Sequence, residues 1–166
     1  MVNDSPPARP PALKILVIIE AVFAVAGFMS GAWLLADPSG EAMGLSHLLE
    51  DIPFEDFTPV GVFFVICYGF LPAFAAYGLW TRRRWRWIDA VTKWTGHHWA
   101  WLASAMIGII LILWIAVEIY YLGILDGVGG ILQASMATLG IVILGFIMIP
   151  SVRQSTRLDD RKPPAI

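Results

Sequence analysis

The stretch from Leu102 to Leu122 constrains the fold more than any other part of this sequence. It is almost entirely apolar and contains one charged residue, Glu118. A helix needs about 20 predominantly apolar residues to cross the hydrocarbon core of a bilayer. Because a helix formed by this stretch would have almost no polar side chains to expose to water, the stretch predicts a transmembrane helix.

Three other stretches share this character, and the four together predict an all-α protein, a four-helix transmembrane bundle in one domain. The predicted spans cover about 13–36, 58–80, 98–122 and 131–150. Apolar residues make up 58% of the 166 residues and charged residues only 14%, which is more apolar than a soluble domain requires. Pro72 lies inside the second span and predicts a kink, because proline removes a helical hydrogen bond.

The segments between the spans differ in composition. Residues 1–12 are rich in proline and predict a disordered tail. Residues 37–57 form a loop that begins with turn residues, and its apolar side chains are expected to fold back over the mouth of the bundle. Residues 81–96 form a connector, residues 123–130 a short turn, and residues 151–166 a polar tail.

The charges are segregated along the chain, and this predicts the orientation. All 11 Lys and Arg residues fall in the N-terminal segment, in the connector or in the C-terminal tail. Four spans place these three segments on one side of the membrane. In the loops on the other side, all the charged residues are acidic. Because cytoplasmic segments carry an excess of Lys and Arg, both termini are predicted to be cytoplasmic.

Glu118 is the first candidate site residue. It shares a helical stripe with Trp114 and Tyr121, and Gln133 lies at a similar depth on the fourth span. Ionisable groups within a membrane indicate functional sites, so one hypothesis is a ligand or proton site that opens outward. The alternative is a structural contact, or a carboxylate that reaches the outer interface.

Glu20 is the second intramembrane carboxylate. It shares a face with Gly27 and Gly31, whose spacing is typical of close helix packing, either within the bundle or between two copies. Buried on that face, Glu20 needs a partner, for which His97, His98 or a connector arginine are candidates. The two interpretations are a structural ion pair at the inner interface and a proton relay.

The sequence predicts no metal and no cofactor. His97 and His98 are adjacent, so their side chains diverge by about 100° on a helix, unlike the i, i+4 pairs that converge on one metal. The only cysteine, Cys67, cannot supply the thiol pair that disulfide chemistry needs.

The connector predicts contact with anionic lipids. Its clustered arginines are Arg82, Arg83, Arg84 and Arg86, interleaved with tryptophans that suit the membrane interface. The alternative is that they only anchor and orient the chain. Nucleic acid is not predicted as a partner for a basic patch that lies against a membrane.

Several short motifs carry a resemblance. Asp37-Pro38-Ser39-Gly40, Gly44-Leu45, Pro53-Phe54 and Pro59-Val60-Gly61 resemble the first outer loop of small uncharacterised four-span bacterial integral membrane proteins. The segment Trp114–Glu118 is similar to the third span of those proteins. The resemblance implies a four-helix transmembrane fold in a bacterial plasma membrane, and it implies no activity.

Three functions remain as hypotheses. The first is a non-enzymatic accessory or lipid-associated membrane module, within a homo-oligomer or a larger membrane complex. The second is a small oligomeric carrier or channel that uses the Glu118 cluster. The third is a lipid-modifying membrane enzyme, which ranks last because the sequence shows no Ser/His/Asp, His-rich or acidic metal signature.

Overall fold

The computed structural model describes residues 9–83, 88 and 93–158, and within them the chain is helical. Four helices are long and apolar enough to cross a membrane, as predicted. They are α1 (Pro11–Ala36), the continuous helix Thr58–Thr81, α5 (Trp99–Leu122) and α6 (Gly127–Met148). The chain is therefore a multi-pass membrane protein by the length and composition of its helices.

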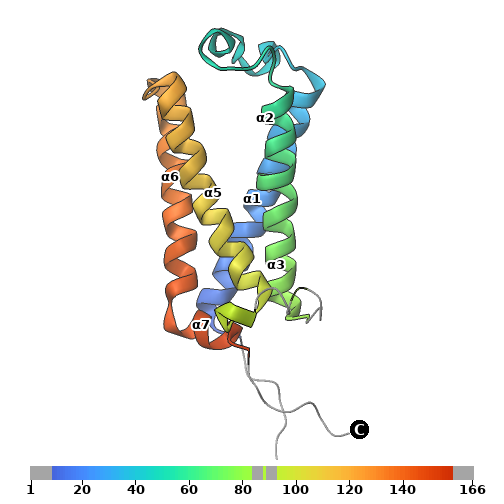
Figure 1. The fold of residues 1–166 in the computed structure, drawn as a ribbon, viewed down its shortest axis with the longest axis vertical. Coiled ribbons are helices and arrows are strands. Elements are labelled where there is room, and N and C mark those ends of the chain that lie inside the picture. The colour runs from blue at the N-terminus through green and yellow to red at the C-terminus, as the bar shows by residue number, and fades with distance from the viewer. Residues whose placement is uncertain (1–8, 84–87, 89–92, 159–166) are drawn as a thin grey trace, which may run out of the picture.

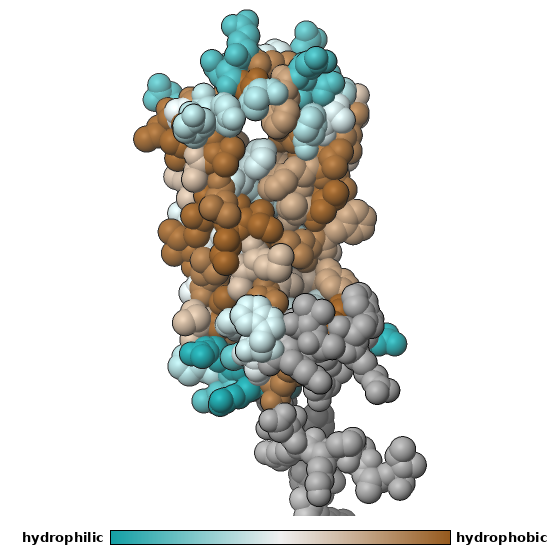
Figure 2. Space-filling view, in the orientation of Figure 1, coloured by the Kyte–Doolittle hydropathy of each residue, from teal (hydrophilic) through white to brown (hydrophobic). Residues whose placement is uncertain are grey.

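The four spans form two pairs (Figure 1). Helix α1 packs along the second span, and α5 packs along α6. The two pairs lie close together at the end that carries the short helix α7 (Pro150–Thr156) and spread apart toward the opposite end. Figure 2 shows a broad apolar belt between polar ends, with a hollow between the pairs at the end where they diverge.

The second span is one continuous helix whose hydrogen-bond pattern is irregular in the middle. It consists of α2 (Thr58–Phe63), a π-helical segment (Phe64–Phe70) and α3 (Leu71–Thr81). Pro72 has no N–H to donate to the Tyr68 carbonyl one turn earlier. The hydrogen-bond irregularity that Pro72 predicts takes the form of a local π-helical widening just before it.

Gly27 and Gly31 pack against this irregular segment of the same chain. A Cβ atom on Gly27 would lie 2.2 Å from the Tyr68 carbonyl oxygen, and one on Gly31 would lie 2.7 Å from a Val65 methyl carbon. The glycine face therefore serves packing inside the bundle, which was one of its two predicted roles. An oligomer would have to use another face.

The loop 37–57 is folded and covers the diverging end. It contains two 3₁₀ helices, Glu41–Met43 and Ser46–Asp51, and the second contacts α5. Asp37 organises its start: the Ser39 hydroxyl donates to Oδ1 at 2.5 Å, and the Ala42 N–H donates to Oδ2 at 2.8 Å. These hydrogen bonds hold the pKa of Asp37 below its ordinary value.

Three boundaries differ from those expected. Helix α6 already begins at Gly127, so the turn after α5 is shorter than the predicted 123–130. The beginning of the C-terminal tail is helical, because Pro150 ends α6 and starts α7 at its first helical position. Residues 1–8 of the predicted N-terminal tail lie outside the described residues, and residues 11 and 12 belong to α1.

Candidate functional site

The basic segments meet at one end of the bundle, which we call the basic end. It carries Arg9, Lys14, Arg82, Arg83, Arg153 and Arg157. The Arg9 Nη2 atom donates to the Trp80 carbonyl oxygen at 2.8 Å, and its guanidinium lies 4.5 Å from the centre of the Trp80 ring. This arginine thus joins the start of α1 to the end of α3 through a cation–π contact and a hydrogen bond.

His98 and Trp99 fasten the second span to α5 at the basic end. The His98 Nδ1 accepts from the Ala100 N–H at 3.3 Å and so caps α5. The His98 Nε2 and the Trp99 Nε1 both donate to the Arg83 carbonyl oxygen, at 3.0 Å and 3.1 Å. Since a carbonyl only accepts, these partners assign a neutral His98 with its proton on Nε2. His98 therefore has a structural role here.

His97 lies close to His98 in sequence but faces a different environment. Its Nδ1 donates to the Thr95 carbonyl oxygen at 2.7 Å, and its ring stacks on Trp101 with 4.5 Å between ring centres. It lines a pocket together with residues of α7. The two histidines do not converge on a common point, as their adjacent positions predicted.

Glu20 is buried in the interior, with no exposed surface. Neither carboxyl oxygen has a partner with hydrogen-bond geometry among the described residues. The buried Ser104 of α5 is a neighbour of this carboxyl group, but its hydroxyl donates to the Ala100 carbonyl oxygen at 2.9 Å. Among the described residues, the predicted pairing of Glu20 with His97, His98 or a connector arginine is absent.

Glu118 is held by Trp114, one of its predicted neighbours. The Trp114 Nε1 donates to Glu118 Oε2 at 3.0 Å, one helical turn away. The Trp114 ring stacks on Phe63 at 4.5 Å between ring centres, and the Tyr68 ring lies edge-on to it at 6.4 Å. Glu118 is therefore tied to an aromatic cluster that joins the second span to α5.

Tyr68 is the member of this cluster that sequence reasoning missed. Its ring is buried among Phe23, Phe63 and Phe64, and its hydroxyl has no hydrogen-bond partner among the described residues. The Glu118 carboxylate lies close enough for a Coulombic interaction with it. A tyrosine in an aromatic-rich span gives no sequence signal of its own, because only the packing of the second span against α5 brings the two groups together.

Gln133 and Tyr121 have other roles in the structure. The Gln133 Oε1 accepts from the Leu125 N–H at 3.0 Å, and its Nε2 donates to the Gly123 carbonyl oxygen at 3.2 Å. This buried amide therefore closes the turn between α5 and α6. Tyr121 is 43% exposed and contacts Tyr120 edge-on.

The predicted lipid-contacting arginines are only partly described. Arg82 and Arg83 end α3, and Arg83 is exposed. Arg84 and Arg86 lie outside the described residues. The described chain contains no group of three or more His, Cys, Asp or Glu residues arranged to hold a metal ion.

No protein-family model, curated protein or solved structure matches this chain. Its candidate sites are therefore interpreted from their own geometry.

Proposed function

We propose that this chain is a non-enzymatic, lipid-associated accessory module of a bacterial plasma membrane, with both termini in the cytoplasm. The observation that carries the proposal is the basic end. Chain segments far apart in sequence gather their arginines there, and the described acidic residues outside the spans lie at the opposite end. A ring of basic side chains at the level of lipid headgroups attracts anionic lipids, and the positive-inside rule places that ring in the cytoplasm.

The proposal fits the roles of the polar groups. His98 caps a helix and Gln133 closes a turn, so two of the candidate site residues have structural roles. Arg83, Arg153 and Arg157 at the basic end are exposed, so lipid or a partner protein can reach them. The resemblance to small four-span bacterial membrane proteins supports the same fold and location.

Intact-complex mass spectrometry of the full chain, released from native lipid discs, tests this function. We expect anionic lipids, or a reproducible partner protein, to be retained in preference to zwitterionic lipids. A bare monomer that shows no preference between phosphatidylglycerol and phosphatidylcholine discs would contradict the proposal.

A carrier or channel is the second candidate, and the Glu118–Tyr68 arrangement favours it. The Glu118 carboxylate of α5 interacts electrostatically with the buried Tyr68 hydroxyl of the second span, which has no hydrogen-bond partner among the described residues. Ionisable groups in this setting mark ion and substrate pathways. In proteoliposomes that contain a pH-sensitive dye, a carrier predicts proton flux that is lost in Glu118→Gln, whereas an accessory module predicts equal background flux in both proteins.

A further inference from the structure

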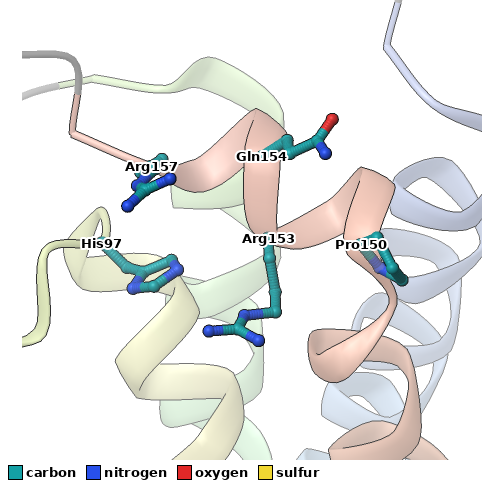
Figure 3. Close-up of a pocket in the computed structure, with 5 residues that line it drawn as sticks. All are labelled: His97, Pro150, Arg153, Gln154 and Arg157. Carbon is teal, nitrogen blue, oxygen red and sulfur yellow. The ribbon is translucent and has the colours of Figure 1, made fainter.

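A pocket of about 290 Å³ opens at the basic end, between α7 and the residues that precede α5 (Figure 3). It is lined by His97, Pro150, Arg153, Gln154 and Arg157. Its volume is near the lower end of the range for small-molecule sites, about 300–1,000 Å³. In Figure 3, Arg153 and Arg157 extend from α7 into the region of the His97 ring.

Backbone hydrogen bonds build this pocket from segments that are far apart in sequence. His97 and Arg157 form an antiparallel bridge, in which the His98 N–H donates to the Thr156 carbonyl oxygen at 2.7 Å. On the other side of the bridge, the Leu158 N–H donates to the Gly96 carbonyl oxygen at 3.0 Å. Gly96 has φ +67°, a conformation that favours glycine. The fold thus holds the Arg157 backbone opposite His97.

The charged groups that line the pocket are the guanidinium groups of Arg153 and Arg157. Neither Arg153 nor Arg157 forms an ion pair with a described residue. Asp159 and Asp160 lie outside the described residues. The His97 Nδ1 is committed to the Thr95 carbonyl oxygen, and Trp101 supports the ring, so Nε2 is the nitrogen left to face a ligand. The two guanidinium groups provide the donors that phosphate groups need, whereas the His97 Nε2 donates to a phosphate oxygen only when the ring is doubly protonated.

The geometry points to a phosphate-binding site formed by Arg153, Arg157 and His97. Arginine forks bind phosphate oxygens through paired, charge-assisted hydrogen bonds. Basic pockets between transmembrane helices on the cytoplasmic side bind phospholipid headgroups. The pocket lies where the spans end, so the phosphate is that of an anionic lipid headgroup. This inference deepens the proposed function and rests on its placement of the basic end among lipid headgroups.

Two double variants of the full chain test the site. Arg153→Gln/Arg157→Gln removes both pocket charges, and Arg161→Gln/Lys162→Gln removes two positive charges from the C-terminal tail. Because both changes are equal in charge, any difference between them reports the pocket and not the general attraction of anionic lipid. Circular dichroism and size-exclusion chromatography check that both variants fold.

The first measurement is retention of phosphatidylglycerol, compared with phosphatidylcholine, by intact-complex mass spectrometry. We expect about a tenfold or greater loss of bound phosphatidylglycerol in the pocket variant, as expected for the loss of two charge-assisted hydrogen bonds. The control variant should retain most of it. The second measurement titrates lipid-free protein in neutral detergent with inorganic phosphate and follows thermal stability.

Each outcome decides between the hypotheses. Loss of phosphatidylglycerol confined to the pocket variant supports a headgroup site. Stabilisation of the wild type by phosphate alone, absent in the pocket variant, supports a phosphate site whose ligand is soluble. Equal loss in both variants, or loss only in the control, overturns the pocket and leaves the lipid-associated function standing. No retention by the wild type of anionic lipid or phosphate overturns both.

Discussion

At the scale of single residues, a few positions determine how neighbouring parts of the chain pack and hydrogen-bond. Gly27 makes room for the Tyr68 carbonyl of the second span, and the Asp37 carboxylate accepts two hydrogen bonds at the start of the outer loop. The buried carboxyl of Glu20 lacks any such arrangement among the described residues. These differences allow the residues to be tested one at a time.

Gly27→Ala is expected to destabilise the protein by about 1–3 kcal/mol, the usual cost of overpacking. The added methyl group would collide with the Tyr68 backbone, which cannot move aside as a flexible side chain can. Thermal unfolding in detergent measures the effect. Gly145→Ala is the matched control, because nothing lies within 4 Å of its added Cβ and alanine favours a helix. Equal stability of the two variants would contradict the packing shown here.

Acidification is expected to loosen the outer loop through Asp37. Its pKa is lower in the folded chain than in the unfolded chain, chiefly because the Ser39 hydroxyl donates to the carboxylate. The stabilisation is therefore fully present above the ordinary pKa of Asp and is lost as the pH falls through the lowered value. Hydrogen exchange of the Ala42 amide measures this opening.

The Asp37→Asn variant isolates this carboxylate from the other acidic residues of the loop. We expect a lower protection factor of the Ala42 amide, its exchange rate relative to the intrinsic rate at each pH, in the variant at neutral pH, with little further change in that factor on acidification. A variant that keeps the full pH dependence of the wild type would show that another acid is responsible.

At the scale of elements, irregular segments determine how regular helices meet. The π-helical segment carries Phe64 and Tyr68 toward α1 and α5, and α7 turns back to pair with the residues before α5. The short turn after α5 depends on one side chain from α6. That turn therefore offers a direct test of how α5 and α6 are held together.

Gln133→Leu is expected to weaken the α5–α6 hairpin by about 1–3 kcal/mol, because it leaves two backbone groups of the turn without partners. Thermal unfolding in detergent gives the size of the effect. Ser135→Leu makes a similar change of polarity at an exposed position two residues away and should be nearly neutral. If Ser135→Leu were as harmful as Gln133→Leu, added bulk on α6 and not the lost hydrogen bonds would explain the result.

At the scale of the whole molecule, the main features are the segregation of charge between the two ends and the divergence of the two helix pairs. The pairs meet at the basic end and spread toward the folded outer loop (Figure 1). The apolar belt in Figure 2 lies between these polar ends. The proposed orientation follows from this polarity and can be measured directly.

Single-cysteine variants in a Cys67→Ala background test the orientation in cells that express the chain. Cysteine at Glu50, in the outer loop, should react with a membrane-impermeant maleimide in intact cells. Cysteine at Gln154, at the basic end, should react only after the cells are lysed. The reverse pattern would place the termini outside and contradict the proposal.

The sequence alone determined the four membrane-spanning helices and the segregation of charge. These follow from composition and length, since a bilayer requires about 20 apolar residues per span with every backbone group bonded within the helix. The close packing expected of Gly27 and Gly31 also follows from local spacing, although the identity of the packed partner does not.

Only the tertiary structure decided which polar groups meet. The sequence placed Gln133 beside Glu118, whereas the fold uses Gln133 in the turn and brings Tyr68 to Glu118 from another span. It likewise pairs the backbone of His97 with that of Arg157, 60 residues later in the sequence, and brings Arg153 into the same pocket. Periodicity identifies the face of a helix but not the face that packs against it, because that depends on how all the helices share one interior.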